Sequence, residues 1–305
     1  PNSGKSSFLA SITNAKPKVS PYPFTTVKPE VGMFRFEDVY FQIVEAPAII
    51  EGSSKGAGEG LVSLTLARNA DVLALVVDVQ NSPLKQLFTL VKELREAGVY
   101  PARKTKGWVK LEKLPPGAGV HLVVMGELKG VSVNEAEKVL IEEGVEDVRV
   151  KVYGELTLDE LKAMVTENAV YKPTLIVANK CDENDHLNVA ERIREAVKGE
   201  LDVIPWSCIK KPNDEQLRKL GYTVFKLANI IRVYTREPGE EPSREPLVLE
   251  KGAKLEDLLR RIHSEFTRRF KYAKVWSRRF KVNPKKVSSL DLELDDGDVV
   301  EVHVR

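Results

Sequence analysis

The residue types at the start of the chain are those that bind a phosphate chain. The run Pro1-Asn-Ser-Gly-Lys-Ser-Ser7 matches the second half of the pattern G-x-x-x-x-G-K-[ST], with Gly4 as its second glycine. Backbone N–H groups around Gly4 and at the start of the following helix can bind phosphate oxygens. Lys5 can reach the β- and γ-phosphates, and the Ser6 hydroxyl is a ligand for Mg²⁺. The segment predicts a nucleotide-phosphate site that comprises Asn2, Ser3, Gly4, Lys5, Ser6 and Ser7.

A second motif, far along the chain, predicts the base. Asn179-Lys180-Cys181-Asp182 follows the apolar run 173–178, where a buried strand would end. The Asp182 carboxylate can accept both N–H donors on the edge of guanine, which adenine does not have. A buried acceptor left without those donors is costly, so such a site rejects the wrong base. The two motifs together are typical of a guanine-nucleotide site, in which Ser207 and Cys208 occupy the position of a loop that contacts the guanine O6.

The metal and the γ-phosphate need a further group, and a threonine-bearing loop could provide it. Pro21-Tyr-Pro-Phe-Thr-Thr26 lies between the first expected helix and an expected hairpin. We favour Thr26 over Thr25 as the residue whose hydroxyl binds Mg²⁺ and whose N–H contacts the γ-phosphate, which would couple loop order to the nucleotide. An ordinary threonine-rich loop is the alternative interpretation.

The segment after the expected hairpin departs from the usual switch pattern. Glu45-Ala-Pro-Ala48 stands where D-x-x-G is typical. Glu45 keeps the charge on a longer side chain, and Ala48 keeps the N–H but resists the positive φ that glycine allows. Ile49 occupies the position where many GTPases have a water-orienting Gln. Nucleotide hydrolysis, if it occurs, has to proceed without that side chain.

Composition limits the class of protein. The chain has 305 residues, of which 42% are hydrophobic and 30% charged, and this length favours about two domains. No apolar run is long enough to cross a bilayer, so we expect no membrane partner. Two cysteines provide no disulfide framework and suit a reducing, cytoplasmic location. The four histidines are scattered without metal-ligand spacing.

The expected elements describe a doubly wound, mostly parallel α/β sheet. Hydrophobic runs at 71–78 and 173–178 predict strands buried on both faces, and the intervening 84–97 predicts a helix. The two strands are too far apart for one βαβ unit, so we predict an inserted α+β module at 101–169, for which no chemistry is evident. Residues 51–60 are expected to be a mobile, glycine-rich segment.

The C-terminal part has a different pattern. Strands are expected at 230–234, 246–249, 272–276 and 299–304, with one helix at 255–266, an order that suggests a β-grasp domain. Eleven basic residues lie between Arg260 and Lys286, interleaved with aromatic residues. Phosphate contact plus base stacking would explain this composition, so RNA is the expected partner and DNA is not. A solvated surface is the alternative. The arginines assigned to the RNA contact are Arg268, Arg269, Arg278 and Arg279.

Taken together, these motifs resemble those of the Obg-like GTPase superclass and most closely the developmentally regulated GTP-binding (DRG) family. The segments that carry the resemblance are Pro1–Ser7, Tyr22–Thr26, Ile50–Ser53, Asn179–Asp182, Ile231–Thr235, Phe270–Trp276 and Asn283–Val287. The resemblance implies a P-loop G domain at 1–100 and 170–229 that lacks its first strand and first P-loop glycine, a ribosomal-protein-S5-like insert at 101–169, and a TGS domain at 230–305. We expect residue 1 to be a fragment boundary.

The resemblance also implies a function. Members act in the cytoplasm with ribosomes or translation factors, in some cases with a protein cofactor, and bind GTP or GDP with Mg²⁺. They resemble potassium-stimulated GTPases, in which a P-loop asparagine, here Asn2, helps to hold K⁺ near the phosphates. With Lys5 and Thr26, Asn2 is therefore a candidate catalytic residue. Two function classes remain open: a slow GTPase that controls ribosome contact, and a nucleotide-binding RNA module that scarcely hydrolyses GTP.

Overall fold

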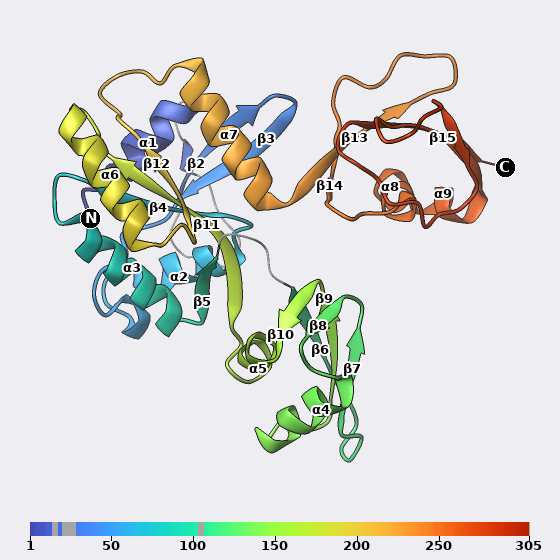
Figure 1. The fold of residues 1–305 in the computed structure, drawn as a ribbon, viewed down its shortest axis with the longest axis horizontal. Coiled ribbons are helices and arrows are strands. Elements are labelled where there is room, and N and C mark those ends of the chain that lie inside the picture. Colours follow the sequence, from blue (N-terminus) through green and yellow to red (C-terminus); the bar gives the residue numbers. More distant parts are fainter. Residues whose placement is uncertain (14–17, 20–28, 103–106, 305) are drawn as a thin grey trace. The chain divides into compact units, whose positions relative to one another are not determined.

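The computed structural model describes residues 1–13, 18–19, 29–102 and 107–304. The threonine loop, with Thr25 and Thr26, lies outside these ranges. Two compact units form, one of Pro1–Ile12, Lys16–Gly32 and Val44–Pro212, and the other of Thr13–Ala15, Met33–Ile43 and Asn213–Arg305. Figure 1 follows their elements in chain order.

The first unit is built around a parallel sheet, as the sequence predicts. Its strands are ordered β12 (Asp202–Pro205), β11 (Val170–Asn179) and β4 (Leu73–Asp78). A further strand that the sequence analysis missed, β5 (Val99–Ala102), pairs with the first half of β11. The register places Asp78 opposite Asn179, so the polar residues that end these strands meet at one edge of the sheet.

Burial explains why these strands are continuous apolar runs. Every residue of β11 from Pro173 onward is buried, as expected of a strand covered on both faces. A core on one side is formed with α2 (Gly60–Asn69), α3 (Pro83–Glu96) and α6 (Asn184–Ala196). Helix α1 (Lys5–Ile12) buries Phe8, whose ring meets the fully buried Trp206 edge to face at 5.2 Å.

Residues 51–60, expected to be a mobile, glycine-rich segment, form a hydrogen-bonded turn. A short 3-10 helix, Ser53–Lys55, lies within it. The Glu93 carboxylate accepts hydrogen bonds from the Gly52 and Ser54 N–H groups, both at 2.8 Å. A Cβ at Gly60 would lie 2.4 Å from the Ser53 Cβ, so this position has room only for glycine. The glycines here permit close packing.

The insert has its own sheet and core. Strands β6 (Trp108–Lys113), β9 (Val148–Tyr153) and β7 (Val120–Val124) are adjacent in that order, and α4 (Val133–Glu142) and α5 (Leu158–Thr166) each begin with a capping box. The region therefore contains both strands and helices, as expected of an inserted α+β module. Strands β8 (Glu127–Lys129) and β10 (Glu155–Thr157) were missed, because three residues are too few to show alternation.

Part of the second unit comes from the N-terminal third of the chain. The antiparallel strands β1 (Lys18–Val19) and β2 (Glu30–Phe36) are followed by β3 (Val39–Glu45), and the hairpin tip groups with α7 (Asp214–Ala228). A Cβ at Gly221 of α7 would lie 2.2 Å from the Phe36 ring. Phe36 also packs against Phe225, with ring centroids 6.3 Å apart. The hairpin tip therefore packs closely on this helix.

The C-terminal sheet has five strands, in the order β14 (Leu247–Glu250), β13 (Ile230–Arg236), β17 (Asp298–Val304), β15 (Phe270–Trp276) and β16 (Lys285–Val287). Helix α8 (Leu255–Ile262) supplies Leu255 and Leu258 to its core. The single helix expected at 255–266 is wrong. His263 is extended, and its Nδ1 accepts a hydrogen bond from the Glu265 N–H, so its side chain caps a second helix, α9 (Ser264–Arg269), instead of continuing the first.

Candidate functional site

The N-terminal loop and the second motif are joined through Asn179. Its side-chain Nδ2 donates to the Ser3 carbonyl at 2.8 Å, and its Oδ1 accepts from the Cys208 thiol at 3.3 Å. Gly4 has a φ of 85°, and a Cβ there would lie 2.4 Å from the Asn179 Nδ2. The close approach and the positive φ both require glycine. This contact connects the loop that begins α1 with the end of β11.

The Asp182 carboxylate, the predicted hydrogen-bond acceptor for guanine, is held by a hydrogen bond at this edge of the sheet. Its Oδ1 accepts from the Ser207 hydroxyl at 2.6 Å, which fixes the carboxylate. Cys181 N–H donates to the Trp206 carbonyl at 2.9 Å, so the loops after β11 and β12 are themselves hydrogen-bonded together. The strand ends and this backbone bond place the Asp182 backbone at the sheet edge, and the Ser207 hydroxyl holds one oxygen of its carboxylate.

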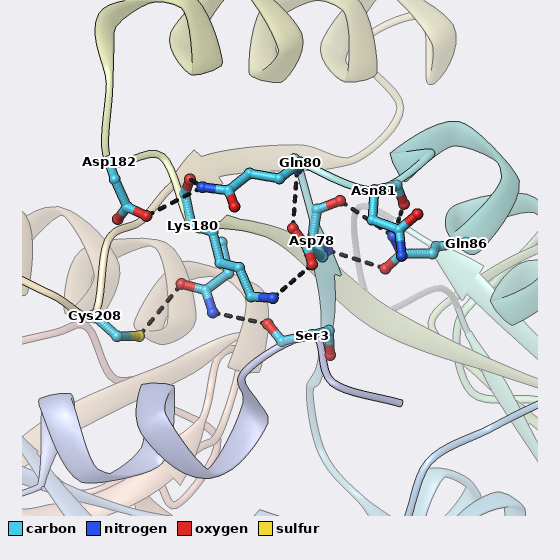
Figure 2. A network of polar contacts seen from close by, with 9 residues as sticks. Ser3, Asp78, Gln80, Asn81, Gln86, Lys180, Asp182 and Cys208 are labelled. Atoms are coloured by element: carbon cyan, nitrogen blue, oxygen red, sulfur yellow. Dashed lines mark hydrogen bonds and ion pairs between the residues drawn. The ribbon is translucent and has the colours of Figure 1, made fainter.

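Three residues that the sequence analysis did not single out complete this region (Figure 2). Asp78, the last residue of β4, accepts from the Lys180 Nζ at 2.6 Å. Gln80 reaches across and donates from Nε2 to the Lys180 carbonyl at 3.1 Å and to the Asp182 Oδ2 at 3.2 Å. Gln86 holds Asp78 through hydrogen bonds to its backbone N–H and carbonyl. Asp78 could have been found, because it ends a predicted strand parallel to the one before Asn179.

The metal side of the site contains fewer partners. The Ser6 hydroxyl donates to the Glu45 Oε1 at 2.8 Å, and the other carboxylate oxygen, Oε2, is buried without a hydrogen-bond partner among the residues that the structure describes. An anionic oxygen buried without a donor is costly, and a hard cation with oxygen ligands would satisfy it. The residues present therefore fit Mg²⁺, held by Ser6 directly and by Glu45 directly or through water.

The segment after Glu45 lacks the polar groups of an ordinary switch. Ala48 does not have a positive φ, so the backbone there follows a path that alanine adopts readily. Ile49 packs against the apolar core that lies between the sheet and its helices. Pro47 accepts a hydrogen bond from the Ser63 hydroxyl at 2.8 Å, which fastens the segment to α2. No side chain of Ala46, Pro47, Ala48 or Ile49 can orient a water molecule.

Glu93 was also missed, because a glutamate on an amphipathic helix is usually solvated. Here it is 1% exposed, and its bonds to the backbone of residues 52–54 lower the pKa of its carboxyl, the Ser54 N–H having the largest effect. Glu93 thereby fastens the turn that follows Ile49 to α3.

The other predicted residues differ in their placement. Ser3, Gly4, Ser6, Glu45, Asn179, Lys180, Asp182, Ser207 and Cys208 are joined by the contacts given above. Asn2 is exposed and has a φ of 58°, while Lys5 and Ser7 lie in the same loop and first helical turn. Thr26 lies outside the described residues.

The four arginines assigned to RNA are not equivalent. Arg268 and Arg269 end α9. Arg278 is exposed after β15. Arg279 donates to the Glu293 carbonyl and lies 3.5 Å from the buried carboxylate of Asp298. Its main contacts are within the chain, and reversing its charge would disturb the turn before β17.

A parallel sheet with a phosphate-type loop before α1 and the N-K-x-D motif at the end of β11 defines the class as P-loop GTPases. Family models match throughout: "50S ribosome-binding GTPase" at residues 1–105, "C-terminal region of MMR_HSR1 domain" at 117–227 and "TGS domain" at 231–304. The chain is 31% identical to an uncharacterized GTP-binding protein of Methanocaldococcus jannaschii, covering all of this chain and 76% of the relative.

The particular family follows from a second relative. The chain is 30% identical to Developmentally-regulated GTP-binding protein 2 of Homo sapiens, over 99% of this chain and 80% of the relative. The chain belongs to the developmentally regulated GTP-binding protein family, which confirms the resemblance noted from the sequence. The YchF GTPase of Schizosaccharomyces pombe shares the fold, with a TM-score of 0.59, 15% identity and coverage of 99% of this chain and 95% of that one.

The family and the structure establish a GTP-binding protein with a TGS domain. Within the described part of the chain, no helix is both long and apolar enough to cross a membrane.

Proposed function

We propose that the chain binds GTP and GDP with Mg²⁺ at the edge formed by β4 and β11, and that it hydrolyses GTP slowly in the cytoplasm. The observation that carries this proposal is the position of Asp182, which is held by Ser207 beside the Asn179 contact to the phosphate-type loop. A fixed carboxylate next to a phosphate loop is what guanine recognition requires. Every step of the proposal depends on these two motifs acting on one nucleotide.

Each residue has a role in this proposal. Asp182 accepts from the guanine edge, while Asn179 and Lys180 shape the base side. Lys5 and the backbone N–H groups from Ser3 to Ser7 bind the phosphates. Ser6, Glu45 and Thr26 hold Mg²⁺, which supplies positive charge at the β- and γ-phosphates. Ser207 and Cys208 lie beside the guanine O6, and the Ala48 N–H faces the γ-phosphate.

Slow hydrolysis is the part of the proposal that depends on the phosphate side, where the usual catalytic side chains are replaced. Ile49 is packed in the core and cannot orient water, and Glu45 and Ala48 replace the usual Asp and Gly. A K⁺ ion near Asn2 could supply the charge that an arginine finger supplies elsewhere. We therefore expect GTP turnover to be low in Na⁺, faster in K⁺, and to lose this difference in Asn2→Ala.

Steady-state phosphate release, measured in K⁺ and in Na⁺, tests the proposal. Glu45→Asp combined with Ala48→Gly should raise turnover if these two residues limit it. A rate indifferent to the ion and to the double substitution, with GTP binding retained, would favour the second candidate: a guanine-nucleotide-binding RNA or ribosome module with little hydrolysis. The observation that keeps this candidate open is the replacement of the usual Asp and Gly by Glu45 and Ala48.

The domain arrangement is part of the proposal. A G domain at 1–100 and 170–229 would carry the nucleotide site, with an insert at 101–169, and a TGS domain at 230–305 would contact ribosomal RNA or a protein cofactor. The description of the matching N-terminal family model as a ribosome-binding GTPase supports this partner. Arg268, Arg269 and Arg278 are the candidate RNA contacts, whereas Arg279 is also needed by its own turn.

Ribosome contact is tested by salt dependence and by substitution. Replacing Arg268, Arg269 and Arg278 with Gln should reduce co-sedimentation with ribosomes and leave GTP affinity unchanged. Each lost phosphate contact should lower the slope of log affinity against log salt by about 1. Sedimentation unchanged at physiological salt would make these arginines a solvated surface.

A further inference from the structure

One face of the C-terminal sheet carries rings and cations in place of an apolar surface. Along β15, Ala273 and Val275 enter the core, so Tyr272, Lys274 and Trp276 lie on the opposite face. The Trp276 ring therefore lies outside the core and is partly exposed. The strand register adds residues of β13, β16 and β17 to this face. We call it the open sheet face, with the members Arg236, Tyr272, Lys274, Trp276, Lys286 and His303.

A buried carboxylate organises the centre of this face. Glu301 is 2% exposed and accepts hydrogen bonds from the Lys274 Nζ at 2.7 Å and the His303 Nε2 at 2.6 Å. The Arg236 Nε lies 3.8 Å from its other oxygen. The hydrogen bond from Lys274 is the largest cause that lowers the pKa of the Glu301 carboxyl. One carboxylate thus holds two basic side chains in place, and Lys286 adds a further exposed charge, so the cations among these members outnumber the one carboxylate that they surround. Tyr234, on the same face of β13 by alternation, donates to Asp38 at 2.9 Å, so an acidic residue borders the face.

The rings on this face form two flat platforms. Tyr272 and His303 stack with centroids 4.3 Å apart and an angle of 15° between their planes, and the Lys286 Nζ lies 4.2 Å from the Tyr272 centroid. Trp276 lies four residues after Tyr272 on β15. The Arg236 guanidinium, from β13, lies 4.8 Å from the centroid of the Trp276 ring. At about 3.3 Å per residue, the two platforms are ~13 Å apart. Each ring is partly exposed and has a cationic side chain over one face, so a base that stacks on Tyr272 or Trp276 has to displace Lys286 or Arg236 from that ring.

This chemistry favours one kind of occupant. Protein interfaces are also enriched in aromatic residues and arginine, but their cores are depleted in lysine, whereas this face places Lys274 and Lys286 beside its rings. Single-stranded RNA needs both: aromatic planes on which bases stack and cations that contact the backbone. The charge and the rings therefore complement a phosphate chain with unpaired bases.

We propose that the open sheet face binds single-stranded RNA, with bases stacked at Tyr272 and Trp276 and phosphates near Lys286 and Arg236. This inference rests on the proposed contact with RNA and places it on the sheet rather than on the arginines that end α9. Lys274, held by Glu301, keeps the surface between the two platforms positive. Sequence preference should be weak, because stacking accepts every base.

The sequence offers a matched pair for the test. Lys285 and Lys286 are adjacent and exposed on β16. Lys286 pairs with Lys274 and lies on the open sheet face, whereas Lys285 pairs with Val275 and lies over the Phe280 ring at 5.1 Å. Lys285→Gln and Lys286→Gln therefore remove the same charge from opposite faces of one short strand.

Fluorescence anisotropy of a labelled twelve-nucleotide oligouridine, titrated with the whole chain, provides the readout. Lys286→Gln should weaken binding about three- to tenfold and lower the salt slope by about 1, while Lys285→Gln should change neither. Tyr272→Leu should weaken binding about five- to hundredfold, and Tyr272→Phe should retain it, since the ring remains. Melting temperatures of all four variants separate lost contact from lost fold.

The outcomes separate two questions: whether the TGS domain binds RNA, and whether the open sheet face is the surface that binds it. Equal effects of the two lysine substitutions, or none from Tyr272→Leu, would overturn the open sheet face. If binding is then lost in the Arg268, Arg269 and Arg278 variant, the RNA contact stands and only its location is wrong. Absence of oligouridine binding at low salt would overturn both and leave protein contact as the role of the TGS domain. Tighter binding of a twelve-base-pair duplex would exclude stacking.

Discussion

The base side and the phosphate side of the proposed nucleotide site differ in how completely their polar groups are hydrogen-bonded. On the base side, Asn179, Lys180, Asp182 and Ser207 each have partners, supplied by strand ends and by the loop before α1. On the phosphate side, one buried oxygen of Glu45 has no partner within the described ranges, and Ile49 packs against the core. If these residues bind the base as proposed, their hydrogen bonds organise the base side without a bound nucleotide. Chemistry at the γ-phosphate depends on groups that a metal ion, a cation or another molecule must complete.

This difference has a functional consequence. Binding energy from a fixed base site is the same for GTP and GDP, so it raises affinity without favouring hydrolysis. The proposed function therefore predicts tight nucleotide binding and slow turnover unless the phosphate side is completed. The substitutions below test whether the two sides are as unequal as their contacts indicate.

The largest effect should come from the base side. We expect Asp182→Asn to weaken GTP binding by about a hundred- to thousandfold, because two hydrogen bonds from guanine to a charged acceptor are worth several kcal/mol in total. Xanthosine triphosphate should regain much of the affinity, since its edge offers an acceptor where guanine has a donor. Equilibrium titration with labelled nucleotides measures both. Unchanged GTP affinity would remove the guanine assignment.

The next effect tests the contact between the two sides. Gly4→Ala should weaken GTP binding about tenfold or more, because the new Cβ would lie 2.4 Å from the Asn179 Nδ2 at a φ of 85°. If the clash acts through Asn179, the losses in Gly4→Ala and Asn179→Ala should not add in a double-mutant cycle. Additive losses would show that the loop and Asn179 act independently.

How far the sequence predicts this site depends on where each residue lies. Asp182 and Gly4 belong to motifs whose chemistry is local, and a buried parallel strand is visible in its apolar run, so these predictions needed no structure. Gln80 and Glu93 act through contacts with residues 102 and 41 positions away, and neither stands in a motif. The same limit applies to Trp276: alternation along β15 is visible, but which face is buried is decided by α8.

A further prediction concerns the turn that follows the phosphate side. Glu93→Gln should lower the free energy of unfolding by about 1–3 kcal/mol, because an amide N–H₂ would face one of the two backbone donors at 52 and 54. The folded pKa of Glu93 is depressed, so its contribution is present above the ordinary carboxyl pKa and is lost as pH falls through the folded pKa.

Urea unfolding at neutral and acidic pH measures this contribution. The difference between the protein and Glu93→Gln should shrink as the pH is lowered. Glu96→Gln is the matched control: this exposed carboxylate on the same helix accepts from the Ser54 hydroxyl at 2.8 Å, and its loss should cost less than about 0.5 kcal/mol. Equal losses in the two variants would mean that Glu93 does not anchor the turn.

The smallest expected effect is a gain in affinity, and it tests whether the base side is fully ready for a nucleotide. Gln80 donates to the Asp182 Oδ2 at 3.2 Å, so it engages one of the two oxygens that guanine needs. If guanine must displace it, Gln80→Ala should tighten GTP and GDP binding about two- to tenfold, the value of one modest hydrogen bond. Both nucleotides should gain equally, because the change is remote from the γ-phosphate, and slower GDP release in a stopped-flow exchange experiment would account for it. Gln80→Glu, which places a second carboxylate beside Asp182, should instead weaken binding. A loss of affinity in Gln80→Ala would show that Gln80 supports the bound base, and the base side would then be only partly formed before the nucleotide binds.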